Sequence, residues 1–266
     1  MTSGIFRLSD DYVLKVAALD PSSATYMGIP GYDHLMTDFS PAGCDARNRL
    51  DLETLAALDT LPAETDDDRL AAGVLRENLE SAIQSHEAGE HLRAIRVIAG
   101  SVESARSVFD LMPTETAADW DIIAERVSHV PEAFAGMRES WALGRDRGIV
   151  TSRRQVLASA EQLDEFAGTP AAPGFFAGLA ESAAAVPGAP VEKLRALAVD
   201  ASRALAETAA FLRNDYLPAA READGCGEES HAAARRQFLG AVIDPREAYE
   251  WGWEETMRLD EEIRRC

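Results

Sequence analysis

The stretch WDIIAERVSHVPEAFAGMRESW, residues 120–141, decides the fold class of this chain. Its large apolar residues recur at three- and four-residue steps, so they share one face of a helix. They are Trp120, Ile123, Val127, Val130, Phe134, Met137 and Trp141. The stripe keeps its phase across Pro131, which predicts either one kinked helix or two helices joined by a very tight break.

The same helical period extends over most of the chain. A second stripe runs from Leu194 to Tyr216, between Pro190 and Pro218. Further helices are expected at about 10–20, 42–60, 66–90, 101–111, 152–167, 228–239 and 245–265. No alternating run of β-branched residues between turn signals is present. The sequence therefore predicts an all-α array or bundle of about eight to ten helices, forming a single helical domain over residues 1–266.

Helix starts and one long loop complete this prediction. Ser9 and Ser40 are candidate N-caps, and Thr116 with Asp119 resembles a capping box. Residues 24–43 interrupt the helical pattern with several glycines and prolines, which predicts a long ordered loop near the N-terminus. Such loops are often functional, although this one could simply wrap the core. The residues that could do so are Tyr26, Met27, Ile29 and Tyr32.

Composition excludes several classes of function. The 266 residues carry 46 acidic and 26 basic side chains, a formal net charge of −20. A surface this negative repels phosphate backbones and anionic lipids, so neither nucleic acid nor membrane is an expected partner. The three cysteines are scattered and form no Cys-x-x-Cys pair, which argues against a disulfide framework and a cysteine zinc site. The first residues include no apolar leader, so we expect a cytoplasmic location.

The best local candidate for metal chemistry is HEAGEH, residues 86–91. A helical zinc-peptidase motif needs two histidines four residues apart, with a glutamate beside the first. His86 and His91 are five apart, which leaves them about 140° apart around a continuous helix. They could ligate one ion only if the helix unwound. We expect His86 to pair with Glu90, and Glu87 with His91, as ordinary helix-surface neighbours.

No other segment presents a catalytic or metal-binding pattern. His34, His129 and His231 are isolated from cysteines and acidic clusters, so we expect surface or capping roles for them. Nucleophile elbows, phosphate loops and dinucleotide fingerprints do not occur. The sequence therefore assigns no catalytic residue and no metal ligand, and leaves the substrate-binding residues open.

The last predicted helix, residues 245–265, is unusually rich in aromatic residues. Tyr249, Trp253 and Met257 share a face, whereas Trp251 points to another side. Core packing is the expected fate of the three residues that share a face. No glycine or proline ends the helix, which favours either a fraying end or a chain cut short within a helix.

Three stretches, in their order and spacing, resemble the N-terminal half of a bacterial family called domain of unknown function 885. They are ATYMGIPGYD (24–33) with DFSPAG (38–43), HEAGEHLRAIRVIAG (86–100) with VFDLMPTETAADW (108–120), and FLGAVIDPREAYEWGWEE (238–255). The resemblance covers essentially the whole chain, but less than half of a typical member. It implies a mostly helical protein related to zinc metallopeptidases. In such proteins a His-Glu pair leading into a Pro-Gly-His-His run lies in the C-terminal half.

This chain has no such run, and residues 86–91 lack its proline and its spacing. No zinc ligand or catalytic base is therefore carried over to any residue here. The resemblance implies the N-terminal helical segment of a zinc-dependent, metallopeptidase-like hydrolase, without the zinc motif and inactive alone. It implies zinc as the cofactor of a full-length member and no cofactor in this chain. Whether the chain is itself an enzyme stays open.

Two further readings follow from the residues. One is a free-standing helical binding module whose acidic groove takes a peptide or a small cationic ligand. The other is a metalloenzyme using His86, Glu87, Glu90 and His91. If the chain is part of a larger hydrolase, we expect apolar surface to be exposed between Tyr249 and Met257. That surface would then contact the missing C-terminal half or drive self-association.

Overall fold

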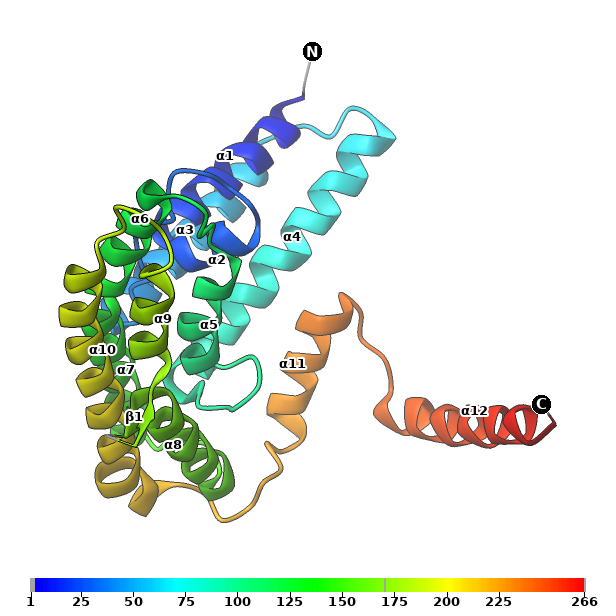
Figure 1. The fold of residues 1–266 in the computed structure, drawn as a ribbon. Coiled ribbons are helices and arrows are strands. Elements are labelled where there is room, and N and C mark those ends of the chain that lie inside the picture. The colour runs from blue at the N-terminus through cyan, green and yellow to red at the C-terminus, as the bar shows by residue number, and fades with distance from the viewer. Residues whose placement is uncertain (1–2, 170, 266) are drawn as a thin grey trace. The chain divides into compact units, whose positions relative to one another are not determined.

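The computed structural model describes residues 3–169 and 171–265, and most of that part is helical (Figure 1). The chain divides into two compact units, residues 1–226 and 227–266, which are described separately. The first unit begins with α1 (Gly4–Leu19), α2 (Pro21–Tyr26), α3 (Pro41–Leu58), α4 (Asp66–Glu87) and a 3₁₀ turn, η1 (Glu90–Arg93). Then follow α5 (Ser101–Ser107), the 3₁₀ turn η2 (Val108–Leu111), α6 (Ala117–Ser128), α7 (Val130–Asp146) and α8 (Arg153–Ala167).

The first unit ends with a short hairpin and a long helix. The hairpin pairs β1 (Gly168–Thr169) with β2 (Ala172–Pro173) in antiparallel register. It is followed by α9 (Phe175–Ala183), α10 (Val191–Phe211), a π turn η3 (Leu212–Tyr216) and a 3₁₀ turn η4 (Leu217–Ala219). The second unit consists of α11 (Glu228–Leu239) and α12 (Pro245–Arg265). The prediction of an all-α protein is confirmed.

The main core of the first unit is built on the stripe at residues 120–141. All seven apolar side chains of that stripe are buried, none more than 2% exposed. Helix α10 packs against α6, α7, α8 and α9, and adds Leu194, Leu205 and other apolar residues to the same core. The break predicted at Pro131 is a tight junction, since α6 ends at Ser128 and α7 begins at Val130.

A smaller core joins α1, α3 and α4. Its buried side chains are Ile5, Leu58, Leu75 and Leu79. Helix α1 begins earlier than predicted, because Ser3 rather than Ser9 accepts the capping hydrogen bond, from Phe6 N. Caps predicted elsewhere are confirmed: Ser40 caps α3, and Thr116 with Asp119 forms a reciprocal capping box on α6.

A line of small residues on α7 lets neighbouring backbone approach this helix closely. Gly136, Ser140 and Gly144 lie four residues apart, so they share one side of the helix. A Cβ atom on Gly136 would lie 2.7 Å from Ser40 N, and one on Gly144 would lie 2.3 Å from Leu92 O. Ser140 Oγ donates a hydrogen bond to Phe39 O at 2.7 Å. Backbone from the loop before α3 and from η1 therefore lies directly on α7.

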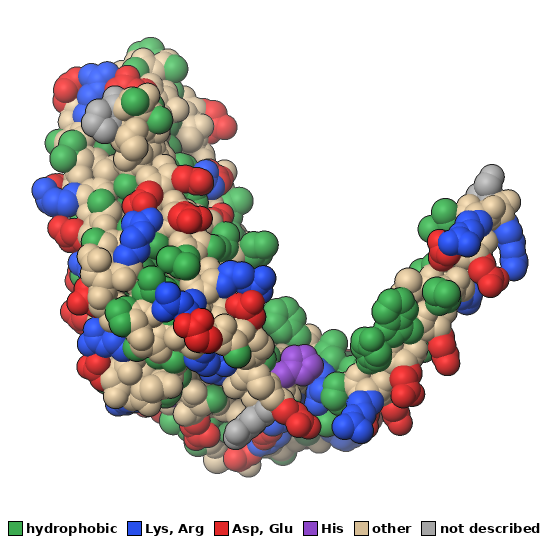
Figure 2. Space-filling view, turned by 90° about the horizontal axis from the view of Figure 1, so that it is seen from below, with side chains coloured by type: hydrophobic (Ala, Val, Ile, Leu, Met, Phe, Trp, Pro, Cys, Tyr) green, Lys and Arg blue, Asp and Glu red, His purple; other side chains and the backbone are tan. Residues whose placement is uncertain are grey.

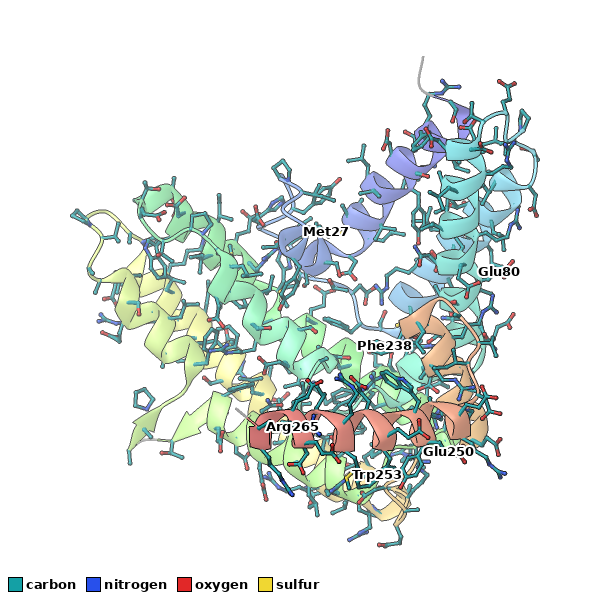
Figure 3. All side chains as sticks on the ribbon, turned by 90° about the vertical axis from the view of Figure 1, so that its right-hand side faces the viewer. Met27, Glu80, Phe238, Glu250, Trp253 and Arg265 are labelled. Carbon is teal, nitrogen blue, oxygen red and sulfur yellow. The ribbon has the colours of Figure 1, made fainter. Side chains whose placement is uncertain are left out.

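The predicted loop at 24–43 is shorter in the structure, because α2 occupies its start and α3 begins at Pro41. The four residues that could have wrapped the core are not part of it. Tyr26 is 48% exposed and Met27, at the end of α2, is 51% exposed (Figure 3), while Ile29 and Tyr32 are only partly buried. The loop is held instead by Met36 and Phe39, which pack against the main core, and by polar contacts.

The main anchor of this loop is Arg126 on α6, which is fully buried. Its Nε donates to Leu35 O at 2.9 Å, and its Nη2 donates to Thr25 Oγ1 at 2.8 Å and to Tyr32 O at 3.1 Å. Burial lowers the pKa of the guanidinium to about 10, partly offset by the nearby Asp33 carboxylate. Arg126 follows Ile123 by three positions, so an arginine within the apolar stripe was the signal in the sequence.

Candidate functional site

The HEAGEH segment forms a turn that brings its two histidines together. Helix α4 ends at Glu87 rather than near residue 90, and Gly89 adopts a left-handed conformation with φ of 70°. Such a backbone conformation suits glycine because it has no Cβ atom. The chain then enters η1, and the rings of His86 and His91 stack with centroids 4.3 Å apart and planes 6° apart. The unwinding that a shared site would require is therefore present.

The partners of these residues differ from those expected. His86 Nε2 lies 3.2 Å from Asp45 Oδ1 on α3, and Glu90 pairs with Arg93 instead of His86. The α4 helix stops before the four-residue spacing can bring His86 and Glu90 together. Burial lowers the pKa of His91 to about 4, and the charge of His86 acts in the same direction. The His91 ring is therefore neutral at pH 7, and its buried Nδ1 has no hydrogen-bond partner among the described residues.

These donors do not fit a zinc ion. Zinc sites in proteins use at least three protein ligands, usually histidine, cysteine or carboxylate. Within the part of the chain that the structure describes, no three such side chains are grouped closely enough to hold a metal. The stacked pair supplies two imidazoles whose parallel rings face each other, whereas ring nitrogens aimed at one point are needed.

A cavity of about 190 Å³ lies beside this turn, between the loop before α3, α3, η1, α5 and α7. Its wall contains both apolar and polar residues: Phe39, Cys44, Arg47, His91, Ala94, Ser101, Met137, Ser140 and Trp141. Arg47 Nη1 donates to Asp38 O at 2.8 Å, and Nη2 lies 3.3 Å from Cys44 Sγ. Burial raises the pKa of the Cys44 thiol despite the opposing charge of Arg47. The thiol is therefore protonated at neutral pH and a poor nucleophile.

A second hollow, of about 400 Å³, lies between β2, α9 and α10. Its lining is mostly apolar: Pro173, Ala177, Ala180, Glu181, Arg195, Ala198, Val199 and Ser202. Its charged groups are paired with each other, since Arg195 Nε and Nη2 donate to the two carboxylate oxygens of Glu181 at 2.8 and 3.0 Å. This ion pair holds the pKa of Glu181 below its usual range, so Glu181 is not poised as a general acid.

The isolated histidines lie apart from both hollows. His34 and His129 are partly buried, and His129 occupies the junction between α6 and α7. His231 is exposed on α11. The structure brings together only His86 and His91 of the five histidines.

Helix α12, in the second unit, is the other distinctive feature. No side chain that the structure describes between Gly227 and Arg265 is buried. Tyr249 is 67% exposed, Trp253 55% and Met257 62%, so the expectation that they pack into a core was wrong. Apolar surface is exposed between Tyr249 and Met257. Figure 3 labels Trp253 on this helix and Phe238, 87% exposed, on α11.

None of the helices in the described residues is both long enough and apolar enough to cross a membrane.

Comparison with known proteins places these features in context. The chain resembles the crystal structure of a proposed lipoprotein from Colwellia psychrerythraea, with a TM-score of 0.75 and 15% identity, over 97% of this chain and 50% of that one. It also resembles a proposed lipoprotein of unknown function from Shewanella oneidensis, with a TM-score of 0.71 and 16% identity, over 98% and 47% of the two chains. The chain thus spans about half the length of each, and the likeness concerns the fold alone.

No curated protein matches the chain in sequence. A family profile, described as bacterial protein of unknown function (DUF885), matches residues 21–266. This match includes all three stretches on which the resemblance in the sequence rested. Because it covers nearly the entire chain, the protein belongs to the DUF885 family.

Proposed function

We propose that residues 1–266 form the N-terminal helical part of a zinc-dependent, metallopeptidase-like hydrolase. The observation that carries this proposal is the coverage of the solved relatives. Nearly all of this chain matches only about half of each relative, so an equal length of those proteins lies outside it. The chemistry is assigned to that other half, because the described residues here do not gather three metal ligands.

In this proposal the chain contributes structure rather than reacting groups. The two cores and the backbone contacts along α7 make a rigid support for one wall of a substrate cleft. Three of the groups with a perturbed pKa lack the properties of a catalytic acid or base. His91 is neutral and half-buried, Cys44 is a protonated thiol, and Arg126 is occupied by the loop that it anchors. The partners of the chain would then be the substrate and the remaining half of the protein.

Metal content and peptide hydrolysis test this proposal directly. The chain purified from zinc-supplemented cells should contain no stoichiometric zinc and should not release dye from fluorescently labelled casein. A tightly bound zinc ion, or hydrolysis by this chain unaided, would overturn the assignment of chemistry to the other half. Sequencing the gene past codon 266 supplies the second test. A His-Glu pair and a Pro-Gly-His-His run downstream would support the proposal, and a stop codon there would contradict it.

A second candidate is a binding module for a small ligand, favoured by the cavity between α3 and α7. Arg47 lines this cavity and makes no ion pair with another described residue, so a carboxylate suits it better than a cation. Benzoate and benzamide are a matched pair of probes with the same ring. Benzoate should raise the melting temperature of the chain while benzamide does not, and Arg47→Met should abolish the difference. Equal effects of the two probes would exclude this candidate.

A further inference from the structure

We infer that one face of α12 is a docking surface for the half of a family-length chain that residues 1–266 do not cover. This inference rests on the proposal that the chain is part of a longer protein. It does not require that protein to be a hydrolase. The partner is thus a segment of the same polypeptide, and the surface is the side of α12 that carries Tyr249, Trp253 and Met257.

The apolar side of α12 is continuous along the helix. Tyr249, Trp253 and Met257 follow one another at four-residue steps, and the rings of Tyr249 and Trp253 meet edge to face with centroids 6.3 Å apart. Ile263, 73% exposed, extends the same side toward the C-terminal end. Figure 2 shows apolar side chains gathered along one side of this helix and acidic ones along the other. A side of this kind fits an apolar groove in a partner.

The opposite side is built to remain in water. Arg258 pairs with Glu255 and Glu262 within the helix, and Arg265 pairs with Glu261. Ion pairs at these spacings are typical of exposed helix surfaces. Trp251 lies on this side, about 200° around the helix from Trp253, and is 66% exposed. The two tryptophans therefore have similar exposure but only one belongs to the proposed docking surface.

The length of the relatives and the charge of the helix together identify the occupant. A helix of 21 residues with such a side exposed is not expected to be stable in water without a partner. Each solved relative has about as much chain again outside the matched part, which supplies a candidate partner. A second copy is disfavoured, because α12 carries seven acidic and four basic side chains and the whole chain has a net charge of −20.

The test compares this chain with a family-length chain expressed from the gene read through codon 266. Hydrogen exchange measured by mass spectrometry should show α12 exchanging fast in residues 1–266 and roughly 100-fold slower in the longer chain. In the longer chain, Trp253→Ser should restore fast exchange in α12, whereas the matched control Trp251→Ser should not. Neither substitution touches a core of the first unit, so both variants should fold.

Three results would overturn the inference. They are unprotected α12 in the longer chain, equal effects of the two tryptophan substitutions, or a stop codon at position 267. Slow exchange of α12 in residues 1–266, with a dimer detected by light scattering, would show that a second copy is the occupant. The zinc content of the longer chain is measured separately. If α12 is protected in the longer chain but no zinc is bound, this inference holds and the proposed hydrolase is contradicted. If zinc is bound but α12 is unprotected, the proposed hydrolase is supported and this inference is contradicted.

Discussion

Replacing Arg126 by methionine should lower the free energy of unfolding of the first unit by about 2–6 kcal/mol. The three shorter hydrogen bonds from Arg126 reach Leu35 O, Thr25 Oγ1 and Tyr32 O. Each hydrogen bond from a charged donor contributes about 1.5–3 kcal/mol, so together they contribute about 5–9 kcal/mol. Methionine removes all three bonds and leaves Leu35 O without this donor, whereas Tyr32 O still accepts from Leu35 N and Thr25 Oγ1 still donates to Asp33.

The burial of the charge offsets part of this loss. The lowered pKa of Arg126, to about 10, corresponds to about 3 kcal/mol that the folded protein spends on holding the guanidinium away from water. Methionine removes that cost, so the expected net loss in the free energy of unfolding is about 2–6 kcal/mol. The free energy of unfolding of Arg126→Lys should lie between those of wild type and Arg126→Met, because one ammonium group cannot reach acceptors on three sides of the loop.

Urea unfolding followed by circular dichroism measures this effect. The matched control is Arg203→Met, because Arg203 is 62% exposed and pairs with Asp200 at 2.5 Å on the surface of α10. That substitution should change the free energy of unfolding by less than about 1 kcal/mol. Hydrogen exchange in residues 27–40 should accelerate in Arg126→Met and not in the control. An Arg126→Met protein within about 1 kcal/mol of wild type would refute the assignment of Arg126 as the anchor of the loop.

Two further predictions concern the turn at His91 and the close contact at Gly144. Because burial lowers the pKa of His91 to about 4, the unfolded chain binds a proton between pH 6.5 and 4 that the folded chain does not. The free energy of unfolding should therefore fall as pH drops through that range, by about 1–2 kcal/mol after discounting for the half-exposed ring of His91. Urea titrations at several pH values measure this dependence on pH, and His91→Gln should weaken it. Gly144→Ala should lower the free energy of unfolding by about 1–3 kcal/mol, because its Cβ would lie 2.3 Å from Leu92 O. The control Gly73→Ala, on α4 with nothing within 4 Å, should stabilise by about 0.5–1 kcal/mol, and equal effects at the two glycines would contradict the contact.

Periodicity predicted the longer helices, because it records which side of each helix is buried, but it missed the short helices α2 and α9. The stripe from Trp120 to Trp141 is buried as predicted, and the capping box at Thr116 marks the start of α6. Local signals were less reliable where tertiary contacts determine the structure of a segment. Arg126, on α6, donates hydrogen bonds to backbone carbonyls of a loop far away in the sequence, and no local pattern encodes such a contact.

The candidate site was likewise predictable only in part from the sequence. The histidine spacing correctly indicated that a continuous helix could not bring His86 and His91 together. The spacing did not predict that Gly89 would end the helix between them, although a glycine near a helix end is a known stop signal. The cavity beside Arg47 was not foreseen, because its wall combines residues from five separate segments. The cytoplasmic location stays a prediction.

The small residues on α7 have a consequence for the cavity beside them. Main chain rests on main chain at Gly136 and Gly144, so these contacts contain no flexible side chains that could rearrange. Ser140, between the two glycines, is at once a part of this contact and a part of the cavity wall. This part of the wall therefore cannot adapt to a molecule that enters, whereas the long side chains of Arg47 and Met137 elsewhere in the wall can.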